Sequence, residues 1–162
     1  MARESARSPG EENPRDITLD DGDLTDMLGE LRVLLPTAQL LSAFLVAVPF
    51  APGFGAIVQA EKHVFLALFM LAVTSLVLFT APAVQHRLMR PLRDRASFKK
   101  LATRQILVGA TTLGAALVLS TQFVLSEVLG HTAGNAAAGA VALLILGVWL
   151  IAPLAWKLQK VA

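Results

Sequence analysis

Four long runs of apolar residues alternate with shorter polar segments along the chain. Each run is close to the roughly 20 residues that an α-helix needs to cross about 30 Å of hydrocarbon, and none contains Lys or Arg in its interior. Because a segment inside a bilayer must satisfy its backbone hydrogen bonds internally, each run predicts a transmembrane helix rather than a strand. The predicted spans cover residues 33–54, 64–83, 106–128 and 136–156.

The residues before the first span fall into two parts. Residues 1–22 are polar and rich in Asp, Glu, Arg, Ser and Pro, and such a segment buries too little apolar surface to fold, which predicts a disordered acidic tail. In residues 23–32 apolar side chains recur at helical spacing, and aspartates precede them at the positive end of the helix dipole. We expect an interfacial amphipathic helix there, with apolar positions at Leu24, Met27, Leu28 and Leu31.

Composition supports a single membrane domain. Hydrophobic residues make up 55% of the 162 residues and charged residues only 16%, whereas soluble domains average about 25% charged residues. The expected fold is all-α: an integral-membrane four-helix bundle made of two helical hairpins over residues 33–156. A short tail at residues 157–162 follows the last span.

The distribution of cations predicts the orientation of these helices. The N-terminal segment through Arg32 holds four Lys or Arg residues, the loop between the second and third spans holds seven, and the C-terminus holds two. Lys62 is the one cation on the other side. Because cytoplasmic loops carry the excess of Lys and Arg near span ends, both termini and the central loop are predicted to be cytoplasmic.

Several classes of function find no support in the sequence. There is no cysteine, which excludes a disulfide framework, a thiolate metal site and a Cys nucleophile. The sequence has no phosphate-binding glycine loop, zinc-protease motif or Ser-His-Asp set, and no feature indicates sequence-specific nucleic-acid binding. We therefore expect no enzyme activity, no cofactor and no metal. The polar start contains no secretory signal peptide, so the first span is expected to be retained.

Gln39 is the most polar residue well inside the first predicted span. It shares a small, polar helix face with Ser42, Ala43 and Val46. This face favours an interhelical hydrogen bond, and a contact to a substrate or ion inside the bundle is the alternative. Pro36 leaves the carbonyl of Arg32 without its helix partner, which predicts a bend near the interface or, alternatively, a polar notch beside Gln39.

Small residues mark one face of each of the last two predicted spans. Such residues let helix backbones approach closely, so both faces are predicted to be packing faces. The face of the third span comprises Thr111, Ala115, Val118, Gln122 and Ser126, and that of the fourth comprises Ala136, Ala140, Leu143 and Gly147. Gly130, His131 and Gly134 are assigned to the loop between the two spans.

Three more residues carry chemistry that a membrane protein could use. Gln122 lies within the third span and, like Gln39, is a candidate for a polar contact inside the membrane. Glu127 falls at the outer end of that span, where a solvated interfacial acid is favoured over proton or cation handling. His86 ends the second span on the predicted cytoplasmic side, where interfacial anchoring is favoured over a titrating switch near neutral pH.

The central loop, residues 87–104, contains seven cations and one acid, Asp94. Positive-inside topology accounts for these cations without any further function. Anionic lipid head groups are a further partner that the loop could bind.

Two sequence elements resemble a known family. The first is the run ELRVLLPTAQLLSAFL that begins at Glu30 and continues to Pro49 and Phe50, and the second is APAVQHR at residues 81–87. Over about residues 24–129 the chain resembles the DUF6328 family of small bacterial membrane proteins, which is frequent in actinobacteria, and its fourth span is similar in hydropathy. The resemblance implies a multi-pass protein of the bacterial plasma membrane, and it implies no particular activity, cofactor or partner.

Two functions fit these patterns. The first is a non-enzymatic accessory or scaffold subunit, either as a homo-oligomer or with a membrane-protein partner. The second is a small ion or proton transporter that forms its path by oligomerising, with Gln39, Gln122, Glu127 or His86 in the path. Transport needs polar residues at mid-membrane depth around one cavity, and two glutamines in a single bundle supply little of that.

The predicted orientation can be tested directly. Reporter fusions placed after Arg95 and after Gly130 should report opposite sides of the membrane, with Arg95 on the cytoplasmic side, because the cations cluster there. An external reporter signal after Arg95 would contradict the orientation.

Overall fold

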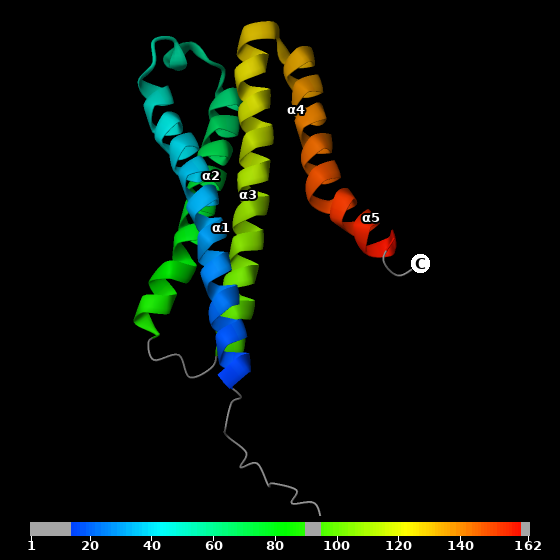
Figure 1. The fold of residues 1–162 in the computed structure, drawn as a ribbon. Coiled ribbons are helices and arrows are strands. Elements are labelled where there is room, and N and C mark those ends of the chain that lie inside the picture. The colour runs from blue at the N-terminus through cyan, green and yellow to red at the C-terminus, as the bar shows by residue number, and fades with distance from the viewer. Residues whose placement is uncertain (1–13, 90–94, 160–162) are drawn as a thin grey trace, which may run out of the picture.

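The structure is a computed structural model that describes residues 14–89 and 95–159, and the elements in these two stretches are all helical. Figure 1 shows four long helices: α1 (Pro14–Ala47), α2 (Gln59–Leu88), α3 (Arg95–Leu129) and α4 (His131–Leu146). Two short 3-10 turns connect α1 to α2, at Val48–Phe50 and Phe54–Ala56. A π-helical turn (Gly147–Ile151) joins α4 to α5 (Ala152–Gln159).

Four helical segments in the described part of the chain are long and apolar enough to cross a membrane. This confirms the predicted all-α fold with four spanning helices, which is the architecture of a multi-pass membrane protein. The segments are Gly29–Phe50, Gln59–Leu88, Ser97–Leu129 and His131–Gln159.

Helices α1, α2 and α3 form the packed core. Phe79 on α2 is the largest fully buried side chain, and its ring lies against Gly109 on α3. A Cβ atom at Gly109 would lie 2.8 Å from that ring, so the glycine allows α2 and α3 to approach closely. Buried apolar side chains form two clusters, one of Leu31, Ala38, Phe79, Ile106 and Leu113, the other of Leu45, Leu68, Ala72 and Ala116.

Helix α4 packs at the edge of this core. Among the described elements, α3 is the one long helix that it packs against, and it leans away from the others toward its C-terminal end (Figure 1). In the most apolar stretch of the fourth span 6% of the residues are buried, compared with 17%, 22% and 28% in the other three. The predicted bundle is therefore open on the α4 side.

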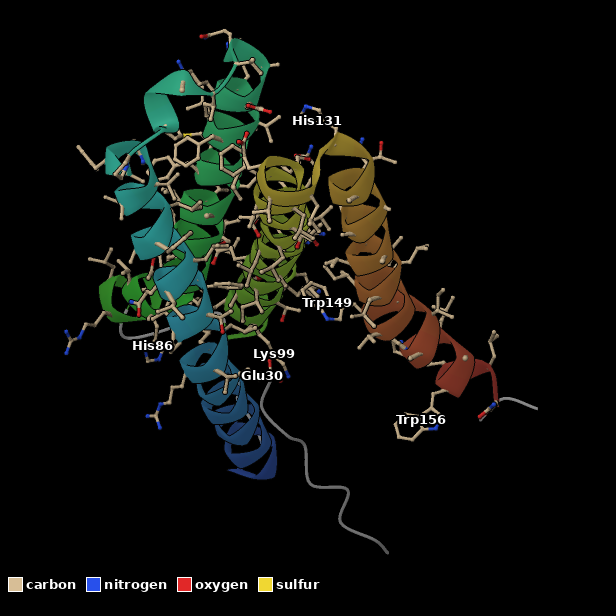
Figure 2. The ribbon with its side chains drawn as sticks, turned by 90° about the horizontal axis from the view of Figure 1, so that it is seen from above. Glu30, His86, Lys99, His131, Trp149 and Trp156 are labelled. Carbon is tan, nitrogen blue, oxygen red and sulfur yellow. The ribbon has the colours of Figure 1, made fainter. Side chains whose placement is uncertain are left out.

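Two glycines control how α4 meets α3. A Cβ atom at Gly134 would lie 2.8 Å from the backbone nitrogen of Ser126 and 2.9 Å from the backbone oxygen of Gln122. Further along, the Trp149 ring points toward α3 (Figure 2) and would lie 3.3 Å from a Cβ atom at Gly114. An apolar groove of about 290 Å³ remains between the two helices beside Trp149.

Pro153 explains the π turn between α4 and α5. Proline has no backbone N–H, so it cannot donate the usual helix bond to the carbonyl four residues earlier. The helix instead widens, and the N–H of Ala152 donates to the carbonyl of Gly147, five residues back. The helical path thus continues to Gln159 without a break.

The structure differs from the predicted boundaries at the start of α1. Residues 14–22 were expected to be disordered and residues 23–32 to form a separate interfacial helix, whereas α1 is one helix from Pro14 to Ala47. Proline suits the first turn of a helix, and the acids that follow it suit the positive end of the dipole. Residues 1–13 of the predicted tail lie outside the described residues.

The last helix also differs from its predicted bounds. His131 and Gly134 were assigned to a loop, but α4 begins at His131. The turn is made by Gly130 alone, with a φ angle of 88° that favours glycine. At the other end residues 157–159 of the predicted tail are helical. The His, Thr and Asn in the run after Gly130 look like loop residues, although His131 lies near Glu61 of α2 and Asn135 accepts a hydrogen bond from Gln122 of α3.

We expect Gly134→Ala to separate α4 from α3. The added methyl group meets backbone atoms that cannot rotate away, so the variant should lose about 1–3 kcal/mol of stability. Gly139→Ala is the matched control on the same helix, because a Cβ atom there would have no neighbour within 4 Å. Thermal unfolding in detergent micelles measures both. Equal melting temperatures for the two variants would contradict the close contact at Gly134.

Candidate functional site

A cluster of ionisable side chains lies at the hairpin end, which is the end where α1 joins α2 and α3 joins α4. Glu61 comes from the first turn of α2, Glu127 from the last turn of α3, and His131 is the first residue of α4. The His131 Nε2 atom lies 3.7 Å from the Glu61 Oε1 atom. The Glu61 and Glu127 carboxyl groups lie within hydrogen-bonding reach of each other. The cluster therefore connects three helices.

Local structure fixes the position of Glu61. The Val58 N–H donates to the Glu61 Oε2 atom over 3.3 Å, which caps the start of α2. Below it, the Phe65 ring lies 6.0 Å from the Phe123 ring of α3, so the antiparallel register of α2 and α3 places Glu61 beside Glu127. Phe54, from the loop before α2, packs edge-on against Phe65 at 5.1 Å between ring centroids.

The two carboxyl groups of this cluster lie close enough for their charges to interact. Two carboxylates at hydrogen-bonding distance repel each other unless a proton lies between them, and a protonated His131 would offset their negative charge. An open hollow of about 260 Å³ beside the pair gives solvent access to Glu61 and Glu127. Among the described residues no group of three or more His, Asp or Glu side chains has an arrangement that could hold a metal ion.

Below this cluster, Gln122 links α3 to α4. Its Nε2 atom donates to the Ser126 Oγ atom at 3.1 Å and to the Asn135 Oδ1 atom at 3.5 Å. Gln122 thus makes the kind of interhelical hydrogen bond that an amide makes inside a membrane. The sequence reading did not single out Asn135. It could have been found from its spacing, since it lies one turn after His131, in the part of α4 that the sequence assigns to the loop before residue 136.

The other two predicted site residues lie elsewhere. Gln39 is exposed on α1, and among the described residues it has no hydrogen-bond partner. His86 is half-buried near the end of α2, with its ring 5.9 Å from the ring of Phe98. Figure 2 shows His86 and His131 at opposite ends of the molecule. Of the four candidates, Gln122 and Glu127 both lie near the end of α3, where Gln122 bonds to α4 and Glu127 lies beside Glu61 of α2, and Gln39 and His86 lie elsewhere.

Two glutamines near the α2–α3 connection were also missed. The side-chain oxygens of Gln85 and Gln105 are buried and have no hydrogen-bond partner among the described residues. Neither position stands out in the sequence, because each looks like an interfacial residue at a helix end.

We expect Glu127→Gln to stabilise the protein at pH 8. The amide can donate to the Glu61 carboxylate without an added proton, so the repulsion between two carboxylates disappears. Its melting temperature should exceed that of the wild type at pH 8, and the difference should shrink at pH 5, where a larger fraction of carboxyl groups is protonated and the repulsion is weaker. Glu30→Gln, at an exposed acid on α1, controls for the loss of one charge. The same difference at both pH values would contradict the repulsion between the two carboxylates.

Comparison with known proteins identifies the family of this chain. A family described as "Family of unknown function (DUF6328)" matches residues 18–153, which is most of the chain. The comparisons with curated proteins and with solved structures gave no match. The match includes both sequence elements that resemble the family, and all four spanning helices lie largely within it. This chain therefore belongs to the DUF6328 family of unknown function.

Proposed function

We propose that this protein is a non-enzymatic accessory or scaffold subunit of the plasma membrane, and that it binds a membrane-protein partner through α4. The observation that carries the proposal is the small-residue face of α4, which the sequence predicts to be a packing face and which turns away from the protein's own helices. Its members Ala136, Ala140 and Leu143 are exposed and Gly147 is half-exposed.

The space around this face supports the same proposal. A Cβ atom at Gly139 or Gly147 would meet no atom within 4 Å. In lipid, helices associate by close backbone packing rather than by the hydrophobic effect, and small residues allow that packing. The opposite side of α4 already uses this device against α3, at Gly134. A second helix can approach the free side of α4 in the same way.

The distribution of polar groups favours this role over transport. Several hydroxyl groups within the spans donate to carbonyls of their own helices, as Ser75 does to Ala72 at 2.7 Å and Thr111 to Leu107 at 2.8 Å, whereas the buried Ser42 hydroxyl has no partner among the described residues. Gln39, which lies well inside the first span, is exposed on the outside of the bundle. The described residues thus place these polar groups on separate surfaces instead of around one cavity.

The positions of the Lys and Arg residues support the rest of the proposal, which concerns the orientation of the protein and its contacts with lipid. Both termini and the loop between α2 and α3 are proposed to be cytoplasmic, because nearly all Lys and Arg residues lie there. Arg87, Lys100 and Arg104 flank this loop and are exposed. They would contact anionic lipid head groups. Residues 90–94 of the predicted lipid-binding loop lie outside the described residues.

A photo-crosslinking amino acid at position 140 tests the proposal in native membranes. It should give an adduct of one defined mass, larger than the chain and different from twice its mass, because the face contacts one partner. The same amino acid at Val77, which is 59% exposed on α2, is the matched control and should give lipid adducts only. Ala140→Trp should abolish co-purification of the adduct's partner, since the larger side chain prevents close backbone approach.

Two results would overturn this assignment. One is an adduct pattern at position 140 that matches the pattern at position 77. The other is ion-dependent flux in proteoliposomes of the purified protein that Gln39→Leu removes, because such flux would show transport.

A further inference from the structure

Gln39 is a polar side chain well inside a membrane span, and it faces away from the bundle. It lies six residues after Val33, where the first apolar run begins, and eleven before Phe50, where the first spanning segment ends. It is exposed, and among the described residues it has no hydrogen-bond partner. Lipid tails offer neither donors nor acceptors, so an amide at this depth needs a partner from another protein chain.

A neighbouring polar residue on α1 contrasts with Gln39. The Thr37 hydroxyl, two residues earlier on α1, donates to the carbonyl of Val33 over 3.2 Å and so satisfies itself within its own helix. Ser42, one turn later, is buried on the side that faces α2 and α3. The predicted face of Gln39, Ser42, Ala43 and Val46 is therefore divided, and Ser42 alone turns inward.

The surface around Gln39 is suited to another helix. Pro36, Ala43 and Val46 lie one or two turns from Gln39 on the same side of α1, and all three are exposed. Their side chains are short, so a second helix can reach the amide. Pro36 also lacks the N–H that would bond the carbonyl of Arg32, which leaves an acceptor near one end of this surface.

We infer that the partner of this surface is a second copy of the chain, in a parallel dimer in which Gln39 pairs with Gln39 of the second copy. An amide carries both a donor and an acceptor, so two identical amides can form reciprocal hydrogen bonds. All copies of a membrane protein with one orientation are related by axes normal to the membrane, so a two-fold axis places equal residues at equal depth. A second copy thus places its own Gln39 amide at the same depth in the membrane.

The dimer surface is separate from the surface in the proposed function. Helix α1 makes no packing contact with α4 among the described residues, so a dimer through α1 leaves the small-residue face of α4 free. The inference therefore does not depend on the partner proposed for α4.

Cysteine crosslinking tests the dimer in membranes, and the chain provides a clean background because it has no cysteine. Ala43→Cys should form a disulfide-linked dimer on oxidation, because it lies one turn from Gln39 on the proposed interface. Phe44→Cys is the matched control at the same depth. Phe44 is 63% exposed but lies a quarter-turn or so further round the helix, so it should crosslink several-fold less.

The amide itself is tested in the Ala43→Cys background. Gln39→Leu should reduce the crosslinked fraction several-fold, whereas Gln39→Asn should retain part of it. Leucine suits a lipid-facing position, so the variant should fold, and single-molecule photobleaching in liposomes should show it as monomers. Equal crosslinking at positions 43 and 44, or an unchanged dimer fraction in Gln39→Leu, would overturn the inference. Adduct formation at position 140 measures the proposed function separately, and Gln39→Leu should leave it unchanged.

Discussion

Close backbone contact between helices is the interaction on which this structure depends. Lipid tails are as apolar as leucine, so burying an apolar side chain between helices gains little of the energy that drives packing in water. Van der Waals contact and a few interhelical hydrogen bonds replace it. Gly109 admits the Phe79 ring between α2 and α3, and Gly134 lets α4 reach the backbone of α3. Where such a residue meets no neighbour, as at Gly139, its side of the helix is free to contact another helix.

Proline residues show how the helices satisfy the backbone when a donor is missing. Pro36 and Pro82 both lie inside long helices, α1 and α2, which continue past them. Pro82 is fully buried against the neighbouring helices, whereas Pro36 is exposed. At Pro153 the helix widens into a π turn instead. Prolines are tolerated in membrane helices because local adjustments of this kind compensate for the lost bond.

The number and type of helices could be predicted from sequence, and their rotation about their own axes could not. The bilayer requires about 20 apolar residues per crossing, which leaves an unmistakable pattern in hydropathy. Hydropathy does not show which face of a helix meets lipid and which meets another helix, because lipid and protein interior are equally apolar. The face at Ala136 and Ala140 looked as suitable for packing as the one at Gly134 and Ala138, yet the second is buried against α3.

The polar cluster was missed for a related reason. Glu61 and His131 are far apart in sequence, and only the register of α2 and α3 and the early start of α4 bring them together.

The π turn has a consequence for the phase of the last span. An extra residue per turn rotates everything after it relative to a regular helix, so positions that share a face before Gly147 do not share it with positions after Ile151. The small-residue face of α4 therefore stops at the turn instead of running the full length of the span. Substitutions in α5, whose described side chains are all exposed, can accumulate without changing which side of α4 is free. The last span behaves as two independent surfaces on one continuous helix.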